Sequence, residues 1–242
     1  PMTNSWRFST LIDRHRALGS NLEDWSGMGT AWSYSKGDPD AEYEAIRTKA
    51  GLMDVSGLKK VHITGHAASH VIERATTRNM EKLMPGRAVY ACMLNDAGKF
   101  VDDCVIYRMG PNSFTVVHGS GQGHEQLTMA ATGRDVSIRF DDNLHDLSLQ
   151  GPLAVDYLAK HVPGIRDLPY FHHMQTQLFG LPVMISRKPS MQSLKDGFSE
   201  KSFLTADEEA GFKTYWLSNQ ISFGKFDTPV SVFAKEADVV QF

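Results

Sequence analysis

The sequence predicts an α+β fold in which antiparallel strands are mixed with helices. Two strand-like runs, Ala88–Leu94 and Phe100–Met109, are joined by the turn formers Asn95, Asp96 and Gly98, as in a β-hairpin. Segments with the apolar spacing of helices lie before and after this hairpin. With 242 residues, of which 41% are hydrophobic, the chain can form one large domain or two small ones with a real core. Strands paired through turns and mixed with helices are typical of the α+β class.

Helix and strand signals follow in order in the first part of the chain. Asp38 before Pro39 predicts a helix start, because Asp caps the first turn and Pro fits the first helical position, and Gly51 predicts its end. The apolar face of this helix is expected to hold Tyr43, Ile46 and Ala50. A strand over Leu58–Ile63 and a helix over Ala67–Thr76 are expected next.

The predicted elements after the hairpin alternate between strand and helix. In chain order they are a strand at Phe114–Val117, a helix at His124–Ala131, strands at Val136–Phe140 and Leu147–Gln150, and a helix at Pro152–His161. The aromatic-rich segment 188–242 has too many apolar side chains for a disordered extension, and its Pro229–Ala234 run is strand-like. We therefore expect two parts, residues 1–187 and residues 188–242.

The glycine-rich run Gly119–Gly123 allows two interpretations. Glycines in front of a helix can hold a phosphate through backbone N–H groups, but this run lacks the Lys-Ser/Thr of a P-loop and has GxGxG in place of GxGxxG. A flexible turn is the favoured interpretation.

Composition disfavours several classes of partner. The formal net charge is −3 and no basic tract is present, so no nucleic-acid partner is expected. No apolar run reaches the roughly 20 residues that cross a bilayer, and the first residues lack a signal-peptide core, so a cytoplasmic protein without membrane contact is expected. Cys92 and Cys104 lie in neighbouring predicted strands and are expected to be thiols. No metal-binding motif is found, and the adjacent His172 and His173 are expected at the surface.

The twin carboxylate Asp102-Asp103 is the most informative candidate site. Adjacent residues of a strand point to opposite faces, so one of the two acids must face the interior or a cleft. A buried ionised carboxylate is costly without a partner. The acid could cap a turn or pair with an arginine, or it could serve chemistry.

The residues around these acids resemble the T-protein family of the glycine cleavage system, the aminomethyltransferases, and related folate-dependent demethylases. The matching segments are RTKAGLMDVSGLKKVHITG (Arg47–Gly65), the run Gly86-Arg87-Ala88-Val89-Tyr90, MLNDAGKFVDDCVIYR (Met93–Arg108) and LQGP (Leu149–Pro152). They occur in the family's order and at its spacing, from about Trp25 to about Arg187. The resemblance implies a T-protein-like folate-binding domain with antiparallel sheets and packed helices.

The resemblance also implies a cofactor and residue roles. Tetrahydrofolate would receive a one-carbon unit from a small-molecule donor, and a carboxylate near its N5 and N10 atoms would take part in proton movement. This catalytic role falls on Asp102 or Asp103, both of which would also contact the folate. Tyr90 matches a folate-contacting Tyr. His118 stands where the family has a folate-contacting Asn, and Leu58 stands where, after the DVS run, the family has a Met that packs against the cofactor. The resemblance therefore implies that His118 and Leu58 also contact the folate.

Other departures leave two functions open. The family's Tyr-Thr-Gly-Glu-like segment, whose Glu grips the pterin, is absent after Arg187, and so is its C-terminal barrel. The first function is a folate-dependent aminomethyl or methyl transferase, complete or as a subunit whose pocket is finished by a second protein or another copy of the chain. The second is a non-catalytic assembly or regulatory subunit that binds folate or a partner chain. The identity of the one-carbon donor cannot be read from the sequence.

Overall fold

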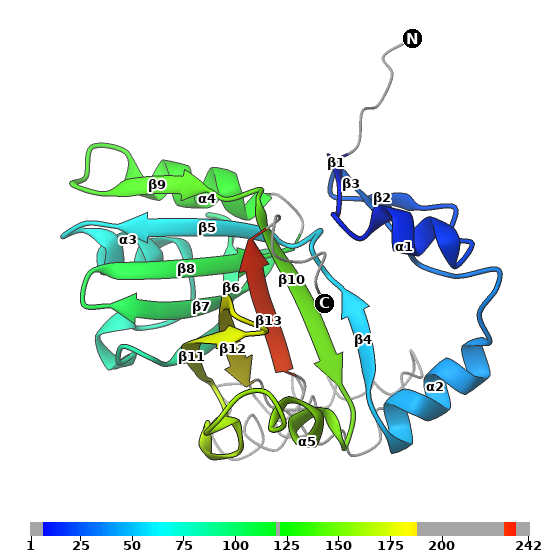
Figure 1. Cartoon of the computed structure of the whole chain (residues 1–242). Helices are drawn as coiled ribbons and strands as arrows, with labels where there is room; N and C mark the ends of the chain where they lie inside the picture. Colours follow the sequence, from blue (N-terminus) through cyan, green and yellow to red (C-terminus); the bar gives the residue numbers. More distant parts are fainter. Residues whose placement is uncertain (1–6, 120–121, 188–229, 236–242) are drawn as a thin grey trace, which may run out of the picture.

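The structure, a computed structural model, describes residues 7–119, 122–187 and 230–235, and its strands form three sheets (Figure 1). Sheet I has the strand order β6 (Ala88–Leu94), β7 (Phe100–Gly110), β8 (Ser113–His118), β5 (Lys59–Thr64) and β9 (Ser137–Phe140). Sheet II has the order β11 (His172–Leu178), β12 (Leu181–Arg187), β13 (Val230–Lys235), β10 (Leu144–Gln150) and β4 (Gly51–Asp54). All pairs within these two sheets are antiparallel, which confirms the predicted α+β class.

Helices cover one face of sheet I. Helices α3 (Ala68–Ala75) and α4 (Gln122–Ala131) and the 3-10 turn η1 (Met80–Lys82) lie on this face. The core between them is apolar, and its largest fully buried side chains include Ile63, Ile72, Met93, Ile106, Phe114 and Leu127. Burial of apolar side chains on this scale is the main stabilising term of such a layer.

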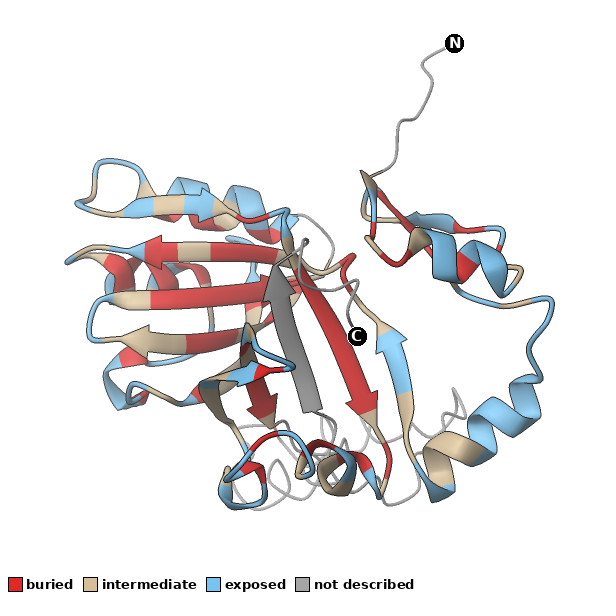
Figure 2. Ribbon diagram, viewed as in Figure 1, coloured by how far each residue is buried: buried red, intermediate tan, exposed pale blue. Residues whose placement is uncertain are grey.

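Sheet II packs against the other face of sheet I and carries its own cover. The inter-sheet cluster consists of Ala88, Tyr107 and Val117, with Leu58, Val105, Met109, Leu144, Phe171 and Met184 packed against it. On the far side of sheet II, a second core packs against helix α5 (Ala154–Leu158) and the 3-10 turn η2 (Ile165–Asp167). Figure 2 shows the buried residues running along β8 and β10.

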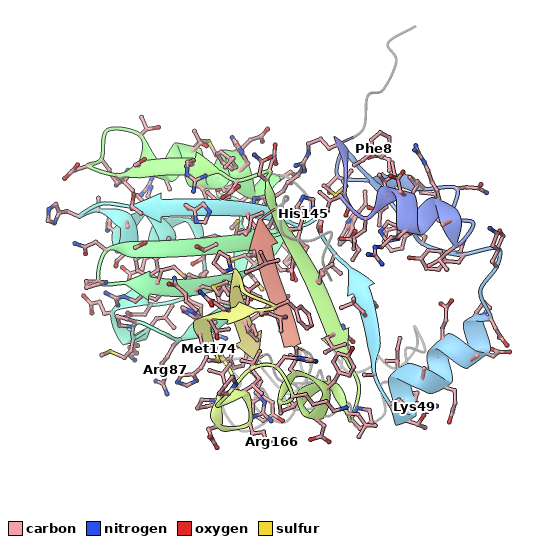
Figure 3. The ribbon with its side chains drawn as sticks, in the orientation of Figure 1. Phe8, Lys49, Arg87, His145, Arg166 and Met174 are labelled. Carbon is pink, nitrogen blue, oxygen red and sulfur yellow. The ribbon has the colours of Figure 1, made fainter. Side chains whose placement is uncertain are left out.

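The two sheets are joined at one corner. Arg87, directly before β6, forms an isolated bridge with His172 of β11, and its Nε donates to His172 Nε2 at 3.1 Å. The next histidine, His173, is half-buried and contacts the ring of Tyr107 edge-on. Figure 3 labels Arg87 and Met174 at this corner. The adjacent histidines are therefore part of the sheet junction and are not both simple surface residues.

The N-terminal residues form a small unit beside the ends of the large sheets. It contains β1 (Arg7–Phe8), α1 (Ile12–Ala17), β2 (Glu23–Trp25) and β3 (Met28–Thr30). Ser26 and Gly27, with φ of 54° and 80°, connect β2 to β3. Positive φ at both central residues is the geometry of a type I′ turn, which matches the twist of a hairpin. Phe8 is labelled on this unit in Figure 3.

Most predicted elements are present, with two corrections. Asp38 caps helix α2 (Pro39–Thr48) by accepting from the N–H groups of Asp40 and Ala41, as predicted. The expected apolar face of α2 is present only in part: no residue of the helix is buried and Tyr43 is exposed, whereas Ile46 is half-buried and Ala50, just after the helix, packs against the second core. In Figure 2 the helix carries no buried colour. The helix expected at Pro152–His161 is shorter, since only Ala154–Leu158 is α-helical.

The predicted division at residue 187 stays a prediction. Residues 188–229 and 236–242 lie outside the described residues, and with them most of the aromatic-rich segment. The strand expected at Pro229–Ala234 is present as β13, which pairs with β10 and β12. Among the described residues, none of the helices combines the length and the apolar character needed to cross a membrane.

A buried acid ties the N-terminal unit to sheet II. His15 on α1 contacts Asp54 on β4 through its Nε2 at 3.0 Å from Oδ2, and Tyr34 through its Nδ1 at 2.9 Å. Burial alone would raise the pKa of Asp54, but the hydrogen bonds from His15 and Ser56 hold this pKa at about 2. The charged form of Asp54 is therefore favoured by the fold.

We expect this contact to be lost in acid. The pKa of Asp54 is lower in the folded chain than the usual 3.8, so its stabilising effect is complete above about pH 4 and falls away toward pH 2. The shift corresponds to about 2 kcal/mol of unfolding free energy. Urea unfolding of the wild type and of Asp54→Asn at pH 5, 4, 3 and 2 would measure it. The stability gap between the two proteins should close with acid, and a gap that does not change with pH would contradict the assignment.

Candidate active site

The two acids of β7 lie on opposite faces of sheet I. Residues of β7 with even numbers, such as Cys104 and Ile106, pack into the core under α3 and α4, whereas Val105 and Tyr107 belong to the inter-sheet cluster. Asp102, which has an even number, points to the helix-covered face and is buried, with 3% of its surface exposed. Asp103 follows the odd set and is half-buried. One acid does face the interior, as the sequence predicted, and the other faces the second sheet.

Asp103 forms a pair with Tyr90 of the neighbouring strand. The Tyr90 hydroxyl donates to Asp103 Oδ2 at 2.5 Å. Burial, followed by the hydrogen bond to Asp103, raises the pKa of Tyr90 well above its usual 10. The phenol therefore remains a proton donor at every physiological pH. The pair places a carboxylate and a hydroxyl at one point on the inter-sheet face.

Cys92 lies beside this pair on the same strand as Tyr90. It is the Cα partner of Asp103 in the β6–β7 ladder, and burial together with the Asp103 charge raises the pKa of its thiol. Cys104 is buried, and its Cα partner is Ala91. Because Cys92 follows the inter-sheet face and Cys104 the helix-covered face, the two thiols diverge, and both are free. Thiols were predicted, and both are present.

Leu58 lies on the same side of sheet I as the Asp103–Tyr90 pair. Like Val105, it packs against the inter-sheet cluster that contains Val117, and Val105 and Val117 are Cα partners in the β7–β8 ladder. Polar groups of the pair thus adjoin an apolar surface. This combination suits a flat heterocycle with a polar edge.

Asp102 and His118 form a separate, buried arrangement on the helix-covered face. Asp102 Oδ2 lies 3.0 Å from His118 Nδ1 and accepts from the N–H of Gly123 at 3.2 Å, while its Oδ1 accepts from the N–H of Asp103 at 2.8 Å. The side chain of His118 has no exposed surface, and its Nε2 has no hydrogen-bond partner within the described part of the chain. Asp102 therefore connects β7, β8 and the first turn of α4.

The five residues predicted from the sequence thus fall into two groups. Tyr90, Asp103 and Leu58 share the inter-sheet face, whereas Asp102 and His118 face the helices. The groups meet at the end of β8. A Cβ added at Gly119 would lie 3.7 Å from Asp102 Oδ1 and 3.9 Å from Asp103 Oδ1. The sequence pattern of a single strand cannot predict that the two groups lie close together at Gly119, because this depends on the pairing of β7 with β8.

The tip of the N-terminal hairpin also reaches this point, which sequence reasoning missed. The Ser26 hydroxyl donates to the carbonyl of Gly119 at 2.9 Å, and Lys59 Nζ donates to the carbonyl of Ser26 at 2.7 Å. Trp25 packs so closely on Gly57 that a Cβ there would lie 2.6 Å from the indole ring. The sequence signal that could have predicted this hairpin is the dipeptide Ser26-Gly27 between two strand-like runs.

An apolar hollow elsewhere in the fold contains none of these residues. It measures about 280 Å³ and lies on the α5 side of sheet II, between residues such as Leu52, Leu149, Tyr157 and Phe179. It has few polar groups to orient a reacting molecule. The Asp103–Tyr90 pair is therefore the better candidate for a reactive site.

The closeness of Gly123 to the Asp102–His118 pair gives a testable prediction. A Cβ at Gly123 would lie 2.8 Å from His118 Nδ1 and 2.9 Å from Asp102 Oδ2, and both side chains are buried. Gly123→Ala should therefore lower the free energy of unfolding by about 1–3 kcal/mol through overpacking. Urea unfolding followed by circular dichroism would measure it. Gly119→Ala is the matched control, since its Cβ would meet only ordinary van der Waals contacts. If the two variants had the same free energy of unfolding, the close packing of Gly123 on Asp102 and His118 would be contradicted.

Comparison with known proteins places this geometry in a family. A family model described as "GCVT N-terminal domain" matches residues 11–189. The "Heme-dependent oxidative N-demethylase gamma subunit" of Ectopseudomonas mendocina is 66% identical over 186 residues, which are 77% of this chain and 49% of that protein. An "Aminomethyltransferase" of Rubrobacter xylanophilus is 31% identical over 185 residues, or 75% of this chain and 49% of the relative. The chain spans about half the length of these curated relatives.

A solved structure agrees at the level of fold. The glycine cleavage system aminomethyltransferase T of Bartonella henselae superposes with a TM-score of 0.74 at 19% identity, covering 98% of this chain and 56% of that chain. At this identity the likeness speaks for the fold alone. The predicted resemblance is confirmed: the chain belongs to the GCVT N-terminal domain family.

Proposed function

We propose that this chain is a tetrahydrofolate-dependent one-carbon transferase that acts as a subunit of an oxidative N-demethylase. The observation that carries the proposal is the Asp103–Tyr90 pair, which lies beside an apolar surface in a chain of the GCVT family. The 66% identical relative is named as the gamma subunit of a heme-dependent oxidative N-demethylase. Identity at that level over three quarters of this chain supports a shared role.

The residues present fit tetrahydrofolate. Leu58 and Val105, which are half-buried, would offer an apolar surface for a flat ring, and Asp103 Oδ1 with the Tyr90 hydroxyl oxygen would offer acceptors for N–H groups of its polar edge. When bound, tetrahydrofolate would supply two nitrogen nucleophiles, N5 and N10, which take up a one-carbon unit at the oxidation level of formaldehyde with loss of water. Asp103 would accept or return the proton at these nitrogens.

Tyr90 has a positioning role in this scheme. Its hydroxyl holds Asp103 Oδ2, and its raised pKa keeps the phenolic proton in place. The carboxylate is then fixed in one rotamer with its other oxygen directed near Gly119. Fixing a proton-transfer group in this way lowers the entropy cost of reaching the transition state.

The name of the relative also indicates where the one-carbon unit would come from. Oxidation of an N-methyl group followed by cleavage of the C–N bond releases the carbon at the oxidation level of formaldehyde. A folate-dependent subunit would capture this carbon before it reacts elsewhere. The donor is thus proposed to be formaldehyde or the methylene unit that precedes it, delivered by another subunit.

The second candidate is a non-catalytic subunit that keeps folate binding or an assembly role. It is favoured by one observation, that the 66% identical relative is named as one subunit of a larger enzyme. Binding without turnover would distinguish this role from that of an enzyme.

Calorimetric titration of the full chain with tetrahydrofolate tests the proposal. We expect saturable binding in the micromolar range, followed by formaldehyde-dependent formation of methylenetetrahydrofolate faster than the uncatalysed condensation. Binding without this acceleration would favour the non-catalytic role. No heat at high micromolar tetrahydrofolate, for the chain alone and together with its demethylase partners, would refute folate binding.

A further inference from the structure

Two tryptophans form an aromatic corner at the N-terminal unit. The ring centroids of Trp25 and Trp32 lie 5.6 Å apart, and the ring planes meet at 55°. Trp32 is 58% exposed, which is unusual for an indole, while Trp25 is half-buried. Contiguous exposed apolar surface generally marks a binding site, and an indole is well suited to contact a flat ring.

The corner is anchored to the end of β8 beside Asp103. Trp25 directly precedes Ser26, whose hydroxyl donates to the carbonyl of Gly119 at 2.9 Å. Gly119 is the residue whose Cβ would lie 3.9 Å from Asp103 Oδ1. Lys59 Nζ, bonded to the carbonyl of Ser26 at 2.7 Å, brings a cation to the same point. Trp25 is held further by its packing on Gly57, which directly precedes Leu58.

We propose that the corner formed by Trp25 and Trp32 binds the p-aminobenzoyl ring of tetrahydrofolate, so that the β2–β3 hairpin forms one side of the folate site. This inference rests on the proposed function. Aromatic rings of ligands prefer stacked or edge-to-face contact with indoles, and the two indoles of the corner are tilted against each other by 55°. A short hairpin fixed by a type I′ turn gives a rigid support for such a contact.

The chemistry of the corner favours this ring over the pterin. A pterin carries several donors and acceptors along its edge, and leaving them unpaired in an apolar contact is costly. The p-aminobenzoyl ring is attached to N10, next to the reacting atoms, and leads to a glutamate whose carboxylates need water or a cation. The exposed position of Trp32 matches that end of the molecule.

The test compares two ligands on the full chain by isothermal titration. Tetrahydrofolate contains the p-aminobenzoyl ring, and 6-methyltetrahydropterin lacks it. Trp32→Ala should weaken tetrahydrofolate binding about tenfold, in line with the loss of one stacking contact, and leave 6-methyltetrahydropterin binding within about twofold of the wild type. Trp25→Phe, which keeps a ring on the packed hairpin, should weaken tetrahydrofolate binding by less.

Tyr157→Ala is the matched control, because Tyr157 is an equally exposed aromatic residue on the α5 side of sheet II. It should leave both affinities unchanged. Circular dichroism would show that each variant folds. If the wild type binds tetrahydrofolate and Trp32→Ala binds it equally well, the corner is not the ring site, although the proposed function stands. If Trp32→Ala weakens both ligands equally, the assignment to the p-aminobenzoyl ring is wrong. If the wild type binds neither ligand, the proposed function fails together with this inference.

Discussion

Replacing Asp103 with Asn is expected to lower the rate of one-carbon transfer by about 10²-fold or more, because the amide cannot take up or return a proton. The amide has nearly the shape of the carboxylate and can still accept from the Tyr90 hydroxyl, so folding should be retained. Single-turnover formation of methylenetetrahydrofolate would measure the rate. Binding of tetrahydrofolate should change far less than turnover, since the lost interaction belongs to the transition state.

Tyr90→Phe separates proton transfer from positioning. The variant keeps Asp103 but removes the hydroxyl that holds its Oδ2, so the rate should fall by less than in Asp103→Asn. If Asp103→Asn transferred one-carbon units at the wild-type rate, the carboxylate would have no catalytic role. A Tyr90→Phe rate below that of Asp103→Asn would instead move the main role to the phenol.

The sequence predicted the part of the fold that depends on neighbours in the chain. The β6–β7 hairpin follows from alternating apolar residues and an Asn-Asp-x-Gly turn, and the α2 cap follows from Asp38 before Pro39. Each of these features is set by contacts within a few residues. The family motifs extended the prediction to the T-protein-like fold, which the structure confirms.

The features that the sequence did not predict depend on long-range contacts. Strands β4 and β12 belong to sheet II through partners far along the chain, and β13 lies between β10 and β12. The predicted apolar face of α2 was wrong for the exposed Tyr43, because a helical pattern gives the spacing of apolar residues but not the surface that covers them. Burial of that face depends on elements elsewhere in the molecule.

The candidate site shows the same division. The sequence placed Asp102 and Asp103 on opposite faces but could not tell which face meets the second sheet. That assignment depends on the pairing of Cys104 with His118 and on α4 covering the even-numbered side of β7. The hairpin contact of Ser26 with Gly119 spans 93 residues of sequence and has no local signal beyond its turn.

The two neighbouring acids therefore have different expected effects when mutated. Asp103 faces the inter-sheet side, where its carboxylate accepts a short hydrogen bond from the Tyr90 hydroxyl. Asp102 is buried and holds three groups from separate segments, namely the N–H of Asp103, the N–H of Gly123 and the His118 ring. Mutation of Asp103 is expected to lower the rate of one-carbon transfer, and mutation of Asp102 is expected to lower the free energy of unfolding.

Asp102→Ala should lower the free energy of unfolding by about 3–5 kcal/mol, because it leaves a buried imidazole and two backbone N–H groups without their acceptor. Only 3% of the Asp102 surface and none of the His118 side chain is exposed, so the groups that lose the carboxylate lie away from solvent. Urea unfolding followed by circular dichroism at pH 7 would measure the change. Asp103→Ala is the matched control on the adjacent residue and should cost much less, since its side chain is half-buried and anchors no helix. A cost below about 1 kcal/mol for Asp102→Ala would show that this carboxylate does not hold β7, β8 and α4 together, and the assignment of separate roles to the two acids would then have to be abandoned.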